Sequence, residues 1–157
     1  MNYLYVQGVM TYYQGRFKAK NPGKYRGDAS DIIYRSSWEL KLMMRLDANP
    51  NVIWWSSETT VIPYRSPIDG KVHRYYIDFT VCVQQPDGKK KHMLIEVKPK
   101  VQTKPPTIQE GKTKSKKYIR EVMTWGVNEA KWKAATEFAK DRGFEFKIFT
   151  EKDLGIK

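Results

Sequence analysis

Two acidic residues, Asp78 and Glu96, lie inside stretches of the sequence that otherwise favour β-strands. Asp78 belongs to YIDFTVCV and Glu96 to MLIEVK, and each takes a position that a strand would normally give to Val or Thr. Lys98 follows Glu96 by two residues, so both side chains are expected on the same face of one strand. Paired carboxylates are ligands that a hard divalent cation such as Mg²⁺ prefers. These positions are therefore the first candidates for a site.

The two acidic stretches are expected to pair as a hairpin around the turn Pro86-Asp87-Gly88. Facing residues would then have numbers that add up to about twice 87, which places Asp78 opposite Glu96. Their Cβ atoms would be about 5 Å apart. Two ionised carboxylates at that separation repel unless a cation lies between them. Asp87 is rejected as a partner of Glu96, because Asp-Gly is ordinary turn chemistry and the strand separates the two by roughly 30 Å.

Each candidate also has an ordinary structural interpretation. Asp78 could be an acid at a strand edge that pairs with Arg35 or Arg74. Glu96 and Lys98 could form a solvent-exposed ion pair, which contributes little stability. The position of Asp78 on the face that also carries Glu96 favours a functional site instead.

A helix with its own acid precedes these strands. The sequence SSWELKLMMRLDANP has an apolar stripe, a capping residue at Ser36 and a stop signal at Asn49-Pro50. Glu39 lies three residues after Ser36, which is the spacing of a capping box. Glu39 is therefore either a cap or a site residue, and the two roles are compatible.

The remaining elements alternate in a way that predicts an α/β domain with a mixed sheet flanked by helices. Strands are expected at 52–55, 59–64, 72–84 and 91–98, followed by a Pro-rich loop at 99–111. Two short helices are expected at 114–125 and 129–142, ended by Gly126 and Gly143. FEFKIFT predicts a final strand.

Composition indicates one globular domain. The chain has 157 residues, of which 40% are hydrophobic and 13% aromatic, and the tryptophans at 38, 54, 55, 125 and 132 are expected in the core. Cys82 is the only cysteine, which excludes a disulfide within the chain and a cysteine-rich zinc site. The chain has no run of about 20 apolar residues and no signal-peptide pattern. These features favour a reducing, cytosolic setting without membrane contact.

Positive charge is concentrated in two segments of a chain whose formal net charge is +12. Residues 1–30 include AKNPGKYRGD, which is rich in turn formers, and are expected to form an irregular, basic N-terminal arm ahead of a single domain at 31–157. Residues 10–27 of this arm are expected to wrap DNA rather than pack as core. A second basic stretch lies between Lys98 and Arg120, where Glu110 is the only acid. Such stripes attract DNA or RNA more often than they serve solubility alone. The expected nucleic-acid contacts are Arg16, Lys18, Lys20, Lys24, Arg26, Lys100, Lys104, Lys114, Lys116 and Lys117.

YIDF followed by LIEVKPK resembles the PD-(D/E)XK nuclease superfamily, in which Ile77 replaces the Pro of the family name. The wider pattern, from YRSSWELKLMMRLD through EVKPK to KWKAATEFAKDRGFEFKIFTE, is similar to the TnsA-type transposase endonucleases. QGRFKAKNPGKYRGDASDIIYRSSWE resembles the head-completion nucleases of large tailed phages, and only residues 1–9 lie ahead of the part that can be matched.

The resemblance implies a restriction-endonuclease-like core of the order αβββαβ and a metal-dependent hydrolysis of phosphodiester bonds in DNA. Asp78 and Glu96 would hold Mg²⁺ or Mn²⁺ together with the backbone carbonyl of Val97. Glu39 would reach the same metal through water or help a second one. Lys98 would orient the attacking water or neutralise charge on the phosphate.

The resemblance also implies a biological setting. The enzyme would trim the ends of packaged phage DNA during head completion, in the host cytoplasm or in association with the virion, and portal or head proteins would be partners. Double-strand cleavage requires two sites, which a homodimer or two successive nicks would supply. A DNA-binding structural head-completion protein with an inactive remnant site and a basic RNA-binding module are the two alternatives.

Overall fold

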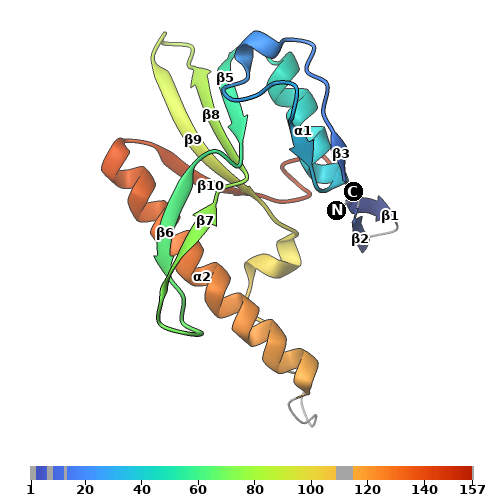
Figure 1. The fold of residues 1–157 in the computed structure, drawn as a ribbon, viewed down its shortest axis with the longest axis vertical. Helices are drawn as coiled ribbons and strands as arrows, with labels where there is room; N and C mark the ends of the chain where they lie inside the picture. Colours follow the sequence, from blue (N-terminus) through green and yellow to red (C-terminus); the bar gives the residue numbers. More distant parts are fainter. Residues whose placement is uncertain (1–2, 7–8, 13, 109–114, 157) are drawn as a thin grey trace.

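The sheet at the centre of the molecule is mixed, and a helix covers each of its faces (Figure 1). A computed structural model describes residues 3–6, 9–12, 14–108 and 115–156. The strand order is β10-β9-β8-β5, with β10 parallel to β9 and the other pairs antiparallel. This arrangement confirms the expected α/β class with a restriction-endonuclease-like core. The central elements are α1 (Ser37–Ala48), β5 (Val52–Ser57), β8 (Phe79–Gln84), β9 (Lys90–Val97), α2 (Lys116–Arg142) and β10 (Glu145–Phe149).

Shorter elements surround this sheet. Three antiparallel pairs join β1 to β2, β3 to β4 and β6 to β7, and two 3₁₀ turns, η1 and η2, complete the fold. Their bounds are β1 (Tyr3–Val6), β2 (Val9–Tyr12), β3 (Gly15–Arg16), η1 (Pro22–Lys24), β4 (Ile33–Tyr34), β6 (Val61–Arg65), β7 (Val72–Tyr76) and η2 (Lys100–Thr103). Within the described part of the chain, no helix is long and apolar enough to cross a membrane.

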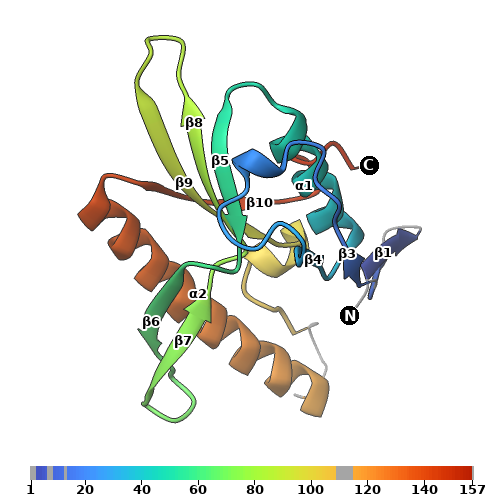
Figure 2. The same cartoon turned by 45° about the horizontal axis from the view of Figure 1, so that its top comes forward.

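The pairs β5–β8 and β6–β7 form one long hairpin that bends in the middle. Ile77 N–H donates to the carbonyl of Thr60 and Glu58 N–H donates to that of Asp78, each over 3.1 Å, so the two strands stay linked across the bend. The φ of Glu58 is 55°, a left-handed backbone conformation that residues other than glycine rarely adopt. The prediction of one unbroken strand at 72–84 is therefore wrong at Ile77 and Asp78. Figure 2 shows β6 and β7 turning away from the sheet toward α2.

Each face of the sheet has its own hydrophobic cluster. Alternation along a strand sends Phe79 and Ile95 toward α1, where they pack with Trp38 and Trp55. Leu94 points to the other face and packs with residues of the β6–β7 hairpin and of α2, including Tyr75, Ala135 and Ala139. Trp38 and Trp55 are buried as expected, whereas Trp54 of β5 and Trp125 and Trp132 of α2 are only half-buried.

Helix α2 is continuous over 27 residues, so the prediction of two helices separated by Gly126 is wrong. A glycine inside a helix costs about 1 kcal/mol relative to alanine. Packing of the half-buried Trp132 and the buried Ala135 and Ala139 on this helix outweighs that cost. Gly143 does end the helix as expected, in a left-handed conformation with φ 68°.

The segment 14–34, which we call the strap, is not the free arm that the sequence suggested. Phe17 and Tyr25 pack against the cluster around Trp55, and Tyr25 meets its ring edge-on at 4.8 Å. The backbone N–H groups of Lys20 and Asn21 donate to the buried carboxylate of Asp47 over 2.9 and 3.0 Å. The expectation that this segment does not pack as core is therefore wrong.

Candidate active site

Asp78 occupies the bend of the long hairpin, directly before β8. The β8–β9 ladder pairs Phe79 with Ile95 and Thr80 with Leu94, which is the register expected from the sequence. The same register continues to Asp78 and Glu96, but the ladder has ended there. Val97 N–H donates to Oδ2 of Asp78 over 2.8 Å instead. Because the β8–β9 ladder ends at Phe79, Asp78 is not paired in that ladder, and its carboxylate accepts a backbone hydrogen bond at the end of the sheet.

Glu96 is almost completely buried and has two polar partners. The hydroxyl of Tyr75 donates to its Oε2 over 2.6 Å, and Nζ of Lys98 lies 3.4 Å from its Oε1. The side chain of Glu96 is only 10% exposed and that of Lys98 only 20%, so this is not the solvent-exposed ion pair considered as an alternative. The backbone N–H of Lys98 donates to the carbonyl of Phe149, which fixes the end of β9 against β10.

Glu39 combines the two roles that its spacing suggested. Its backbone N–H donates to Oγ of Ser36 over 3.0 Å, which caps α1 as expected. Its carboxylate does not complete the capping box on Ser36. It accepts instead from the backbone N–H of Arg35 over 2.5 Å, and the Arg35 guanidinium forms an ion pair with Glu58.

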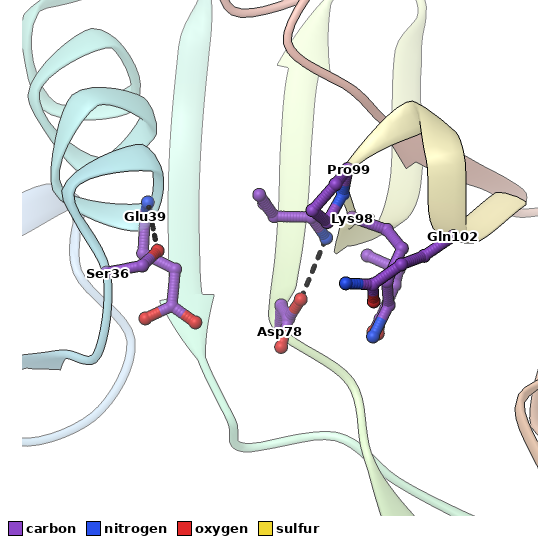
Figure 3. A pocket seen from close by; sticks show the side chains of 8 residues that line it. Ser36, Glu39, Asp78, Lys98, Pro99 and Gln102 are labelled. Carbon is purple, nitrogen blue, oxygen red and sulfur yellow. Dashed lines mark hydrogen bonds and ion pairs between the residues drawn. The ribbon is translucent and has the colours of Figure 1, made fainter. Parts of the chain in front are cut away.

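These residues surround one pocket of about 250 Å³. Figure 3 shows the carboxylates of Glu39 and Asp78 entering it from α1 and from the residue before β8, with Lys98 on the far side of Asp78. The full lining is Ser36, Glu39, Asp78, Glu96, Val97, Lys98, Pro99 and Gln102. All four predicted site residues and Val97 therefore meet here. Asp87 remains in its turn, where it accepts from Lys89 N–H.

The comparison with known protein families agrees with this geometry. Residues 49–151 match the family model described as TnsA-like endonuclease N terminal. The chain belongs to the TnsA-like endonuclease family. It is also 43% identical to the head completion nuclease of Enterobacteria phage T4 over 144 residues, which cover 90% of this chain and 93% of that protein. The resemblance to TnsA-type and head-completion nucleases noted from the sequence is confirmed.

Burial and neighbouring like charges together set the pKa values of the acidic residues in the pocket of this TnsA-like endonuclease. Burial raises the pKa of Asp78 well above its usual range, and the charges of Glu96 and Glu39 raise it further. Burial also raises the pKa of Glu39, although the bond from Arg35 N–H opposes the shift. The pKa of Tyr75 is raised by burial and by the neighbouring Glu96, so Tyr75 remains a hydrogen-bond donor. The pocket therefore favours a bound cation or proton.

The donor set of this site fits Mg²⁺ or Mn²⁺. The described residues contain no group of three or more His, Cys, Asp or Glu side chains arranged to hold a metal by themselves. Mg²⁺ does not require one, since it binds one or two carboxylates and keeps several water molecules. Asp78 and Glu96 are two carboxylates on one pocket, and Val97 adds a backbone segment beside them.

The predicted DNA-binding residues of the strap are of two kinds. Arg16, Lys18 and Lys20 are exposed, although Arg16 also pairs with Asp31 at 3.3 Å. The other two have structural contacts. Nζ of Lys24 donates to the carbonyls of Asp47 and Asn49 over 3.2 and 2.7 Å, and the Arg26 guanidinium lies 4.1 Å from the ring centre of Trp54.

The second basic segment begins beside the pocket and reaches the start of α2. Lys100 and Lys104 follow Lys98 directly on and after η2, and Lys116 and Lys117 begin α2; all four are exposed. Lys114 lies outside the described residues.

Sequence reasoning missed three residues of the site. Tyr75 is distant from Glu96 in sequence and belongs to the β6–β7 pair, so only the bend brings them together. Gln102 enters through the 3₁₀ turn that follows Pro99. Glu58 has one signal that could have marked it, because it lies between the strand patterns at 52–55 and 59–64; in the structure its N–H donates to the carbonyl of Asp78.

Proposed function

We propose that this chain is a metal-dependent DNA endonuclease whose catalytic residues are Glu39, Asp78, Glu96 and Lys98. The observation that carries the proposal is the convergence of three carboxylates and a lysine on one pocket at the end of the sheet. Membership of an endonuclease family and the raised pKa of Asp78 support it.

Asp78, Glu96 and the carbonyl of Val97 would hold Mg²⁺ or Mn²⁺, with Glu39 as a further ligand through water. A bound divalent cation would polarise the phosphate and lower the pKa of a coordinated water. Lys98 would neutralise charge that develops on the phosphate or orient the attacking water. Tyr75 would hold Glu96 in place through its hydroxyl, and Val97 N–H would do the same for Asp78.

The basic side chains would guide DNA to this pocket. Arg16, Lys18 and Lys20 are exposed on the strap, and Lys100 and Lys104 come two and six residues after the site residue Lys98. The remaining candidates are Lys24, Arg26, Lys114, Lys116 and Lys117. Contacts to phosphates make such binding strongly dependent on salt.

The biological setting is proposed from the phage relative. The enzyme would act in head completion and trim the ends of packaged DNA, in the infected host cytoplasm or on the virion. Portal or head proteins would then be partners, and a homodimer or two successive nicks would produce a double-strand cut.

A plasmid-nicking assay tests the proposal directly. Supercoiled plasmid should be nicked by the protein with Mg²⁺ or Mn²⁺ and should remain intact with EDTA. Glu96→Gln should abolish nicking, while Glu137→Gln, an exposed residue of α2 outside the pocket, should not. A protein that binds DNA without nicking it would instead be a structural head-completion protein. Preferential binding of RNA without any cleavage would indicate the basic RNA-binding module.

A further inference from the structure

A second and larger groove opens beside the active-site pocket. It has a volume of about 980 Å³ and lies between the segment 100–107 and the first half of α2. Its residues on α2 are Lys117, Arg120, Glu121, Thr124, Trp125 and Asn128, spaced so that they share one helix face. Nothing in the proposed catalytic set uses this groove.

The groove and the pocket are neighbours that share a lining residue. Gln102 lines both of them, and Lys98 and Pro99 of the pocket lead directly into Lys100 of the groove. The turn that joins them is well anchored. Lys100 N–H donates to Oε1 of Glu151 over 2.7 Å, and Gln102 N–H donates to the carbonyl of Pro99 over 2.9 Å. A ligand in the groove would therefore lie next to the pocket that holds the predicted catalytic residues.

The lining of the groove is both basic and apolar. The lining contains a single carboxylate, that of Glu121, and four basic side chains, those of Lys100, Lys104, Lys117 and Arg120. Glu121 lies 4.0 Å from Lys117, but both side chains are largely exposed, so the ion pair is weak. The apolar part consists of Val101, Pro105, Pro106 and Trp125.

Trp132 supports the ring of Trp125. Its ring meets that of Trp132 edge-on, with centroids 5.8 Å apart and an angle of 80° between the planes. Trp125 is half-buried and belongs to the groove lining, whereas Val101 on the opposite wall is 80% exposed. A braced aromatic ring and an exposed aliphatic side chain thus lie on the two sides of a positively charged channel.

We propose that this groove binds an unpaired strand of the DNA substrate, which places the junction of duplex and single strand at the active-site pocket. The inference rests on the proposed nuclease function and adds a substrate class to it. A duplex presents phosphates and sugars to a protein surface and keeps the faces of its bases stacked inside. An unpaired strand offers both phosphates for the lysines and base faces for Trp125, which is the combination that single-strand binding surfaces use. The preferred substrate is then DNA with a frayed or tailed end.

The test compares the binding of two fluorescent DNAs of equal duplex length, one blunt and one with a tail of unpaired nucleotides. Binding is measured by anisotropy in EDTA, so that the DNA stays intact. The wild type should bind tailed DNA at least about tenfold more tightly than blunt DNA, since stacking contributes of this order for each base. Arg120→Gln with Lys104→Gln should remove most of that preference and weaken blunt binding much less. Trp125→Leu, made separately, should also remove most of the preference and leave blunt binding nearly unchanged.

Matched charge variants serve as controls. Lys133→Gln with Lys140→Gln removes two exposed charges from α2 outside the groove, and it should keep the preference for tailed DNA. Trp125→Leu removes the ring that packs against Trp132 and could prevent folding. In that case the test rests on the groove variant Arg120→Gln with Lys104→Gln, which changes only exposed side chains.

Two outcomes would overturn the inference. An equal loss of blunt and tailed binding in the groove variants would mean that the groove supplies only general positive charge. Unchanged binding of both DNAs would mean that the groove has another occupant, such as a protein segment. Plasmid nicking by the wild type separates these outcomes from a failure of the nuclease proposal, because it requires the pocket but no tailed end.

Discussion

The hydroxyl of Tyr75 donates a 2.6 Å hydrogen bond to the buried carboxylate of Glu96. The two residues belong to different hairpins, and the bend at Asp78 brings them together. The Tyr75 ring also faces Nζ of Lys131 from α2, which lies 5.4 Å from the ring centre. Tyr75 thus orients Glu96, although Tyr75 itself does not line the pocket.

Replacing Tyr75 with Phe should weaken cleavage without unfolding the protein. Loss of a hydrogen bond that orients a metal ligand typically reduces metal affinity or activity by about 10- to 100-fold. We therefore expect Tyr75→Phe to require more Mg²⁺ for half-maximal nicking. Tyr76→Phe is the matched control, because Tyr76 is the next residue of β7 and is exposed. Equal Mg²⁺ requirements in both variants would show that the hydroxyl of Tyr75 is only structural.

Asp78→Asn should stabilise the metal-free protein at neutral pH. The pKa of Asp78 is raised in the folded state, so between its unfolded and folded pKa values the folded protein binds more protons. The free energy of unfolding of the wild type should therefore fall as pH rises through this window from about 4 upward. Thermal unfolding of both proteins at several pH values measures the difference, which should widen as pH increases.

The same variant tests metal binding. Mg²⁺ should raise the Tm of the wild type, because a ligand that binds only the folded state stabilises it. Asp78→Asn should lose most of this increase. An undiminished response would exclude Asp78 as a ligand.

Lys98→Ala should separate catalysis from binding. The variant should fold, keep its stabilisation by Mg²⁺ and bind DNA nearly as well as the wild type, since Lys98 is one of many positive charges. Single-turnover cleavage should fall by about a hundredfold, the usual scale for removing one preorganised electrostatic group. Lys98→Arg should restore activity only in part, because a guanidinium is larger and cannot release its proton. Near-normal cleavage by Lys98→Ala would contradict the catalytic role.

The strap should tolerate loss of its exposed charges but not of its packing. Arg16, Lys18 and Lys20 alternate with the half-buried Phe17 and Ala19. Changing the three basic residues to Gln should leave the Tm within a few degrees of the wild type. It should also weaken DNA binding and reduce the slope of its salt dependence by about one for each phosphate that the protein no longer neutralises.

Phe17→Ala provides the contrasting variant for the strap. It should lower the Tm clearly because Phe17 packs against Trp55, with ring centres 5.9 Å apart. If the triple Gln variant unfolds while Phe17→Ala remains stable, the exposed charges, and not the packing of Phe17, hold the strap in place.

The sequence predicted the parts of the site that depend on local pattern and strand register. Alternation along the strands and the Asp-Gly turn were enough to place Asp78 in register with Glu96, and the cap at Ser36 located Glu39. The bend could not be predicted, because Ile77 and Asp78 continue the strand pattern and only the pairing with Thr60 reveals the break. Tyr75 was missed for this reason.

Helix α2 and the strap show a second limit of local reasoning. Gly126 is a local stop signal, but the tertiary contacts of the residues around it decide that the helix continues. In the strap, positive charge and turn-forming residues indicated an exposed arm. The partner that holds it, Asp47, lies on α1, and nothing in the local sequence of the strap identifies it.

The continuity of α2 has a consequence for how members of this family can differ in length. Its first half forms one wall of the groove, and its second half packs beside Tyr75, with no break between them. Inserting a single residue near Gly126 would rotate one half relative to the other by about 100° and shift it by about 1.5 Å. The α2 side chains that line the groove and those that pack beside Tyr75 could not then both keep their orientation. Insertions and deletions in relatives should therefore fall outside this helix, in the surface turns such as the one at Asp87.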